Sequence, residues 1–456
     1  MRHTKLVLTA MAAALIAACG GSNNPRPGDQ TPKVKFSAQV SFGDSLSDVG
    51  TYKVGTVAAL GGGLFNINGN NTSVNPALTG KNWTEVLAAQ LKLAAPCPAV
   101  TGLDGDASHG FSVPVQAHTG CYGYAQGGSR VTNPVGVGNK LTGSATGALT
   151  YPAVTQVKNH LAAVGGKFKG DELVTMWSGN NDLLFGLGDL AARATAVGTA
   201  AGATAFGTSL TAQLAAGAPN PTTAAQSIGV ALATEAARPG HTDASIVQAA
   251  VTAAVLAGNT AAASPAVYGP MVAKAQADAT AAGAKAGADY AAAQGPALVA
   301  DMAKAGAEMV NLVKSQLIAN GANYVVVVNI PDVSLTPDAL AKDAGTRALI
   351  QSMAKAFNAQ LDAAFAGDPK VLLVDAFTIS QDEAAHPENY AFTNIKDTAC
   401  DLAKTPGGSS LFCTASTLRA GDVSHYSYAD GVHPTPFHYK LIAELVAARM
   451  LTKGWL

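Results

Sequence analysis

Residues 38–48 read AQVSFGDSLSD, in which apolar and polar side chains alternate up to Phe42 and then give way to a Gly-Asp-Ser turn. Alternation of this kind predicts a β-strand. Ser45 follows directly at the end of the predicted strand. A serine hydroxyl becomes a nucleophile only if a neighbouring base removes its proton. The stretch therefore predicts a strand and, at its carboxyl end, a candidate reactive serine.

Three further apolar runs predict buried strands, at residues 173–177, 324–328 and 371–374. Unbroken runs of this kind suit strands that are covered on both faces, as in a parallel sheet between layers of helices. Helical patterns alternate with them, at residues 298–320 and 348–365. This alternation predicts an α/β fold with a doubly wound parallel sheet.

Residues 187–295 differ from the rest of the chain because they are rich in Ala and poor in aromatic residues. Ala favours helix, whereas Gly and Pro interrupt it, so several helices are expected rather than one long rod. Two interpretations of this Ala-rich insertion are open. It forms a helical cap or lid beside the active-site cleft, or it is a surface insertion without a catalytic part.

The first residues of the chain have the layout of an export signal. Arg2 and Lys5 precede an apolar run at residues 6–18, and a run of 13 residues is too short to span a bilayer. Residues 1–18 are therefore predicted to be a signal peptide.

Cys19 follows this signal, and residues 16–19 resemble the lipobox of bacterial lipoproteins. The resemblance implies cleavage before Cys19 and acylation of its thiol, whereas the alternative is an ordinary signal peptide cleaved after Ala18. Polar residues 19–36 would tether the domain to a membrane. Gly20 favours the outer membrane of a Gram-negative bacterium, with a periplasmic or secreted protein as the alternative.

Four cysteines remain beyond Cys19. An even number in an exported protein indicates two disulfides, for which three connectivities are possible. We predict the short-range pairs Cys97–Cys121 and Cys400–Cys413, because each would close a loop rich in Gly and Ser. A metal site is not expected, because the sequence has no CxxC or HExxH spacing.

Charged residues make up only 13% of the chain, about half of the usual share in soluble proteins. The 29 basic and 30 acidic residues give a formal net charge of −1, and no long basic run is present. Phosphate binding needs a concentrated positive surface, so the composition argues against a nucleic-acid partner.

Three later motifs supply the partners that Ser45 needs. His433 is the candidate base, and Asp430, three residues earlier, could accept the hydrogen bond of its Nδ1–H. The backbone N–H groups of Ser45 and Gly128 and the side-chain amide of Asn181 could converge on an oxyanion. Together these residues predict a Ser-His-Asp triad with a Ser/Gly/Asn oxyanion hole.

The motifs resemble the four consensus blocks of GDSL esterases and lipases, which belong to the SGNH hydrolase superfamily. The matching segments are Gly43–Leu46, Gly128, Gly179–Asp182 and Asp430–His433. The hydrolase domain is expected at residues 37–456, interrupted by the Ala-rich insertion. The resemblance implies a flavodoxin-like parallel sheet sandwiched by helices, with the catalytic residues at the carboxyl edge of the strands. It also implies hydrolysis of carboxylic esters through an acyl-enzyme on Ser45, without a cofactor or metal.

A second Asp-x-x-His spacing occurs at Asp422 and His425. We favour His433, because Pro434 follows it as in the family and because Thr435 looks like the N-cap of the last helix. His433 is then expected on a defined turn just before that helix.

Other polar residues near the motifs have structural interpretations. Asp44 and Asp48 are expected to cap a helix that starts near Ser45. Asp182 is expected to bind loop backbone rather than to act as an acid or base. Arg130 is either a contact for an anionic substrate or a residue that pins its loop, and we favour pinning.

Several activities share such a site. Besides a serine esterase or lipase, the alternatives are a carbohydrate O-deacetylase, a lysophospholipase or thioesterase, and an acyltransferase. A different class of protein also remains open, namely a surface lipoprotein that binds a partner on a retired hydrolase scaffold. The expected partners are an ester substrate and a membrane reached through the lipid anchor.

Overall fold

The computed structural model describes residues 33–69 and 80–456. At its centre is a four-stranded parallel sheet with the strand order β1-β4-β5-β6. The strands are β1 (Gln39–Gly43), β4 (Leu173–Trp177), β5 (Tyr324–Val328) and β6 (Val371–Val374). The predicted α/β fold with a parallel sheet is confirmed. The predicted signal peptide, Cys19 and most of the tether lie outside the described residues.

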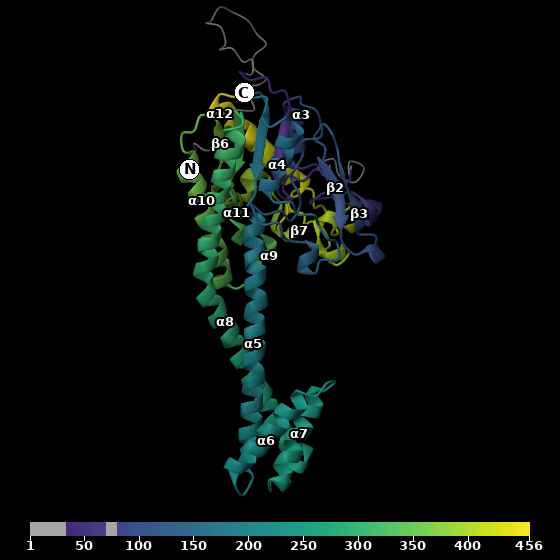
Figure 1. Ribbon diagram of the computed structural model, residues 1–456, viewed down its shortest axis with the longest axis vertical. Helices are drawn as coiled ribbons and strands as arrows, with labels where there is room; N and C mark the ends of the chain where they lie inside the picture. The colour runs from purple at the N-terminus through teal and green to yellow at the C-terminus, as the bar shows by residue number, and fades with distance from the viewer. Residues whose placement is uncertain (1–32, 70–79) are drawn as a thin grey trace, which may run out of the picture.

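Helices cover both faces of this sheet (Figure 1). Alternate residues of a strand point to opposite faces, so Met176 of β4 joins one apolar core and Trp177 joins the other. The first core is covered by α4 (Ala153–Ala163), α10 (Ala344–Phe365) and the last turns of α8 (Pro265–Leu312). The second core is covered by α3 (Trp83–Gln90) and α12 (Pro436–Lys453). All side chains of β1 and β4 are buried, as expected for strands between two helical layers.

The register of β1 on β4 determines where Ser45 lies. Gln39 pairs with Leu173, and the pairing continues to Gly43 with Trp177, so both strands end at the same edge. Ser45 therefore stands at the carboxyl edge of the sheet, where open α/β folds bind their ligands.

The segment before Gly128 runs parallel to β1 on its other side. The Ser41 N–H donates to the carbonyl oxygen of Tyr122 (3.0 Å), and the Tyr124 N–H donates to that of Ser41 (2.8 Å). This pairing brings the loop that carries Gly128 to the same edge as Ser45.

Smaller elements surround this body. They are the helices α2 (Gly55–Ala59), α9 (Pro337–Leu340) and α11 (Ala376–Ala385), the antiparallel pair β2 (Val100–Asp104) and β3 (Ser112–Ala117), and the parallel pair β7 (Asn394–Thr398) and β8 (Tyr426–Tyr428). Disulfides join Cys97 to Cys121 and Cys400 to Cys413. Within the described ranges, no helix combines the length and apolar character that crossing a membrane requires.

The Ala-rich insertion forms helices, as predicted. They are α5 (Asn180–Ala216), α6 (Pro221–Ala236), α7 (Asp243–Leu256) and α8 (Pro265–Leu312), which we call the helical arm. α5 and α8 run side by side away from the α/β body and carry α6 and α7 at the far end (Figure 1). α5 has 37 residues and α8 has 48, so they are about 55 Å and 70 Å long at the helical rise of 1.5 Å per residue.

Prolines interrupt this region less than expected. Pro221 and Pro265 stand at the starts of α6 and α8, where proline removes no helical hydrogen bond. Pro270 and Pro296, in contrast, lie inside α8. Each interior proline removes a backbone hydrogen bond at a cost of about 3 kcal/mol. The packing of α8 along α5 and α10 offsets this cost.

The contact between α5 and α8 depends on glycine. A Cβ on Gly198 would lie 2.7 Å from the carbonyl oxygen of Gly283, and a Cβ on Gly283 would lie 2.8 Å from that of Gly198. The two backbones approach this closely because neither residue has a side chain. The far end of the arm has its own apolar core, which includes Leu210, Ile228 and Val251.

Candidate active site

Ser45 stands in a turn directly after β1. The Asp44 N–H donates to the carbonyl oxygen of Trp177 (3.1 Å), and the Ser47 N–H donates to that of Asp44 (3.1 Å). Gly43 has a φ of +137°, and a Cβ at this position would lie 1.9 Å from the Trp177 carbonyl oxygen. Only glycine therefore allows β1 to turn so close to the end of β4.

This turn replaces the helix that was expected near Ser45. In the described part of the chain the first helix is α2, so the prediction that Asp44 and Asp48 are helix caps is wrong. Their carboxylates hold loops instead, because the turn brings loop N–H groups to them. Asp44 accepts hydrogen bonds from the Leu46 N–H and Asn180 Nδ2, and Asp48 accepts them from the N–H groups of Gly50, Thr51 and Gly127. Burial raises the pKa of both carboxyls to about 6.

The structure brings the three predicted triad residues together. His433 Nε2 lies 2.8 Å from Ser45 Oγ, and His433 Nδ1 lies 2.9 Å and 2.8 Å from the two carboxylate oxygens of Asp430. Burial alone would raise the pKa of Asp430. The His433 ring and the hydrogen bonds that the carboxylate accepts outweigh burial and hold this pKa well below its ordinary value. The donors are the N–H groups of Ser410, Val432 and His433. Asp430 is thus an ionised acceptor that fixes the orientation of the imidazole.

The competing histidine has other partners. His425 Nδ1 bonds to the carbonyl oxygen of Ala391 (2.9 Å), and its ring stacks on Phe437 with centroids 4.2 Å apart. The Asp422 carboxylate accepts hydrogen bonds from the N–H and hydroxyl of Ser424. Neither group belongs to the Ser45 cluster.

The three predicted oxyanion donors each keep a hydrogen without an acceptor in the described structure. No acceptor within the described residues takes a hydrogen bond from the N–H groups of Ser45 and Gly128. Asn181 Nδ2 uses one of its two hydrogens on the carbonyl oxygen of Ser129 (3.0 Å). Gly128 has a φ of +80°, and a Cβ there would lie 1.9 Å from the Val137 carbonyl oxygen, so the position requires glycine.

An ion pair joins the loop after Gly128 to the start of α5. Asp182 accepts hydrogen bonds from Arg130 Nε and from the Val131 N–H, both at 3.0 Å. The Arg130 guanidinium also lies over the Phe185 ring, 4.7 Å from its centroid. Arg130 therefore pins its loop, as expected, and Asp182 binds loop backbone.

A cavity leads from the triad into the α/β body. Ser45, Asn181 and His433 line it together with apolar side chains of α11 and α12, among them Ile379 and Leu445. The reacting groups thus open onto a mostly apolar space, as a binding site for a small molecule requires.

Residues 204–446 match the family of GDSL-like Lipase/Acylhydrolase proteins, over more than half of the chain. The chain belongs to this family. The matched residues contain Asp430 and His433, whereas Ser45, Gly128 and Asn181 precede them. Family membership supports a hydrolase of the ester type.

This GDSL-family chain is also similar to the anther-specific proline-rich protein APG of Brassica napus. The two are 28% identical over 134 residues, which is 28% of this chain and 29% of that protein. The similarity therefore spans less than a third of either protein.

One residue that supports the GDSL serine was not predicted. Gln156 of α4 is buried, and its side chain bonds to both the N–H and the carbonyl oxygen of Gly43, each at 2.8 Å. Its Nε2 also donates to the Ser129 hydroxyl (3.1 Å). Gln156 lies in no motif and 113 residues after Gly43, so no local pattern marks it.

The helical arm contributes little to the cavity at Ser45. In the described structure, the cavity is lined from the arm by Asn180, Asn181 and Leu184 at the start of α5, and by no residue of 187–295. α6 begins beyond the far end of α5, about 55 Å along its axis. This geometry favours a projecting surface insertion over a lid.

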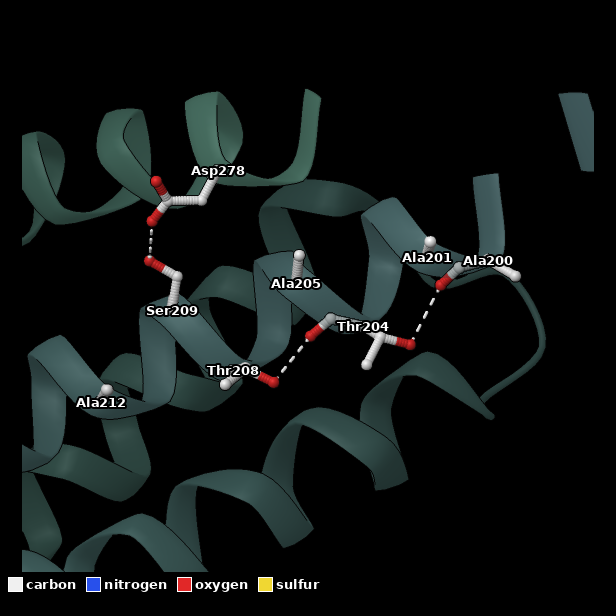
Figure 2. A pocket seen from close by; sticks show the side chains of 8 residues that line it. All are labelled: Ala200, Ala201, Thr204, Ala205, Thr208, Ser209, Ala212 and Asp278. Atoms are coloured by element: carbon white, nitrogen blue, oxygen red, sulfur yellow. Dashed lines mark hydrogen bonds between the residues drawn. The ribbon is translucent and has the colours of Figure 1, made fainter. Parts of the chain in front are cut away.

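A second hollow lies on the arm itself, between α5 and α8 (Figure 2). Its hydroxyls are already used, because Thr204 and Thr208 bond to carbonyl oxygens one turn earlier and Ser209 donates to Asp278 (2.6 Å). The Asp278 carboxylate also binds Lys274, and no histidine among the described residues lines this hollow, so the cluster at the sheet edge is the candidate active site.

Among residues 33–69 and 80–456, no group of three or more His, Cys, Asp or Glu side chains could hold a metal ion.

Proposed function

We propose that this hydrolase is a serine esterase that cleaves carboxylic esters through an acyl-enzyme on Ser45. The observation that carries the proposal is the chain of contacts from Ser45 Oγ to His433 Nε2 and from His433 Nδ1 to Asp430. A base in contact with the hydroxyl, itself oriented by a buried carboxylate, is the arrangement that makes serine nucleophilic.

The reaction begins when Ser45 Oγ attacks the ester carbonyl carbon while His433 Nε2 takes the hydroxyl proton. The ionised Asp430 stabilises the imidazolium that forms and holds its Nδ1–H in place. The tetrahedral intermediate collapses when His433 returns the proton to the leaving alcohol. Water then attacks the acyl-enzyme with His433 again as base, which releases the acid and restores Ser45.

Charge on the former carbonyl oxygen would be met by the N–H groups of Ser45 and Gly128 and by Asn181 Nδ2. Each has a hydrogen without an acceptor in the described structure. Loss of one donor of this kind typically costs about 2.7–4 kcal/mol of transition-state stabilisation. The hydrogen bond from Asn181 to Ser129 holds the amide in position, so little reorganisation accompanies the reaction.

We further propose that the enzyme is an outer-membrane lipoprotein. Residues 1–18 would be the signal peptide, Cys19 the acylated residue, residues 19–36 the tether and residues 37–456 the hydrolase domain. The lipobox-like sequence supports the anchor, and the disulfides Cys97–Cys121 and Cys400–Cys413 are typical of exported proteins. Replacing Cys19 by Ala should abolish incorporation of a labelled fatty acid, and undiminished labelling would contradict the anchor.

A fluorophosphonate probe tests the nucleophile directly, because it reacts covalently with activated serines. The wild-type protein should be modified on the peptide that contains Ser45, and Ser45→Ala should not be modified. Thermal unfolding of both proteins controls for folding. Modification of another serine, or equal modification of the variant, would refute the assignment.

A further inference from the structure

The cavity beyond Ser45 contains a buried ion pair that the proposed reaction does not use. Glu383 of α11 and His438 of α12 both line the cavity, and each is 7% exposed. Glu383 Oε2 lies 3.2 Å from His438 Nε2. The pair shares the cavity with the triad, so it faces whatever part of a substrate enters there.

His438 is fully engaged by its neighbours. Its Nδ1 lies 3.0 Å from the Ser427 hydroxyl oxygen and 3.2 Å from the Ser427 carbonyl oxygen, while Nε2 faces Glu383. Burial alone would lower the pKa of His438, but the Glu383 carboxylate outweighs burial and raises this pKa. The ring therefore has no hydrogen left for a ligand.

Glu383, in contrast, has an oxygen to spare. Its Oε2 is paired with His438, and no donor among the described residues bonds to Oε1. The Glu383 side chain is 10% exposed and lines the cavity. Oε1 can therefore accept a hydrogen bond from a ligand that enters the cavity.

The cavity around this carboxylate is mostly apolar, although Thr336, Ser380 and Tyr428 also line it. Ile379 lies one turn before Glu383 on α11, and Ile442 and Leu445 of α12 also line the cavity. A buried acceptor among apolar walls is costly when a ligand displaces water without bonding to it. A ligand that donates a hydrogen bond at this point avoids the cost.

We propose that Glu383 accepts a hydrogen bond from a hydroxyl group of the substrate, so that the enzyme prefers esters hydroxylated on the part that fills the cavity. This inference rests on the proposed esterase function. The apolar walls match a hydroxylated acyl chain, and a polyol on the alcohol side is the second source of the same group. An ammonium group fits less well, because the His438 ring already lies beside the carboxylate, with Nε2 3.2 Å from Oε2.

Steady-state kinetics on paired esters tests this preference. One series uses p-nitrophenyl octanoate and its derivatives hydroxylated near the carboxyl group, in mid-chain or at the terminal carbon. One hydroxylated ester should exceed octanoate in kcat/KM by about tenfold or more, as expected for a hydrogen bond to a buried charged acceptor. A second series compares hexyl acetate with glyceryl monoacetate, and a preference seen only there assigns the hydroxyl to the alcohol.

Variants identify Glu383 as the cause. Glu383→Leu should abolish the preference for the hydroxylated ester while octanoate is still hydrolysed, and Glu383→Gln, which keeps an acceptor for His438, should reduce it. Ile379→Val is the matched control, because it alters the same wall without altering a polar group and should change both rates alike.

The possible failures are distinguishable. If no ester is hydrolysed, the proposed function fails. If esters are hydrolysed but no hydroxylated ester is preferred, or if Glu383→Leu and wild type show the same ratio, then the pair only joins α11 to α12 and the inference is overturned.

Discussion

The side-chain amide of Gln156 bonds to both backbone groups of Gly43. Oε1 accepts from the Gly43 N–H and Nε2 donates to the Gly43 carbonyl oxygen, each at 2.8 Å. Gly43 is the residue at which β1 turns toward Ser45, so a side chain of α4 holds the turn that carries the proposed nucleophile. Gln156 is 1% exposed, and water therefore cannot replace these bonds.

Replacing Gln156 by Leu should lower both stability and activity. The substitution leaves the Gly43 N–H buried without an acceptor, whereas the Gly43 carbonyl oxygen keeps the Ser129 hydroxyl and the Gln126 N–H as donors. One unsatisfied buried donor should lower the free energy of unfolding by about 1–3 kcal/mol. The turn should also shift, so kcat should fall. Urea unfolding and ester hydrolysis measure the two effects. Gln248→Leu, on the exposed surface of α7, is the control and should stay within about 0.5 kcal/mol of wild type. Equal behaviour of both variants would show that the Gly43 contact is dispensable.

A buried histidine should make the fold sensitive to mild acid. His160 is fully buried among aromatic rings that include Phe42 and Phe168, and neither ring nitrogen has a hydrogen-bond partner in the described structure. Burial lowers the pKa of His160 from 6.5 to about 4. As the pH falls, the unfolded chain binds a proton at His160 before the folded protein does. The contribution of neutral, buried His160 to the free energy of unfolding is therefore complete above about pH 6.5 and is lost as the pH falls toward 4. The loss should reach about 3 kcal/mol.

A matched variant isolates this effect. Asp44 and Asp48 have raised pKa values and contribute in the opposite direction over the same range, because the folded state binds their protons first. The free energy of unfolding of wild type minus that of His160→Leu should therefore fall between pH 6.5 and pH 4. A difference that is independent of pH would contradict the assignment.

Glycine-to-alanine substitutions on α5 should have opposite effects on stability at a position packed against α8 and at a position with open space around it. Gly198→Ala places a Cβ 2.7 Å from the Gly283 carbonyl oxygen, so the helices must separate, at a cost of about 1–3 kcal/mol. Gly207→Ala, also on α5, meets nothing within 4 Å and should stabilise the helix by about 0.5–1 kcal/mol. Chemical unfolding followed by circular dichroism measures both. The same sign of change for the two variants would contradict the described helix contact.

Removing the outer half of the arm should leave the chemistry intact. A Cβ on Gly202 would lie 3.1 Å from the Ala279 carbonyl oxygen, so α5 and α8 are adjacent there and a short Gly-Ser loop can join residue 203 to residue 279. Because the cavity is lined from the arm only at its root within the described structure, kcat and KM for a small soluble ester should not change. A marked change in KM would favour the lid interpretation instead.

The strands and the motif residues were predictable because their signals are local. β1 alternates apolar and polar residues and the other three strands of the sheet are mostly apolar runs, while Ser45 and His433 are framed by short motifs. Gly128 has a positive φ and lies against the Val137 carbonyl oxygen, so the backbone itself requires glycine at this position of the motif.

The parts that were missed depend on tertiary contacts. Gln156 contacts Gly43 and Glu383 contacts His438, and both partners are far away in the sequence. No local sequence motif indicates such contacts. The helix predicted near Ser45 does not form. The Asp44 and Asp48 carboxylates instead accept hydrogen bonds from loop N–H groups that the fold brings close to them. Pro270 is tolerated inside α8 because α8 packs along α5, whereas helix propensity alone predicts a break.

We assign the activation of Ser45 to His433 and not to His425. The most direct measurement is kcat/KM for a p-nitrophenyl ester in His433→Ala and His425→Ala, with the amount of folded protein determined for each. His433→Ala should lower kcat/KM by roughly four orders of magnitude or more, because it removes the base in contact with Ser45 Oγ. His425→Ala should leave kcat/KM unchanged, because that ring bonds to Ala391 and stacks on Phe437. Full activity of folded His433→Ala, or loss of activity in His425→Ala alone, would contradict the proposed triad.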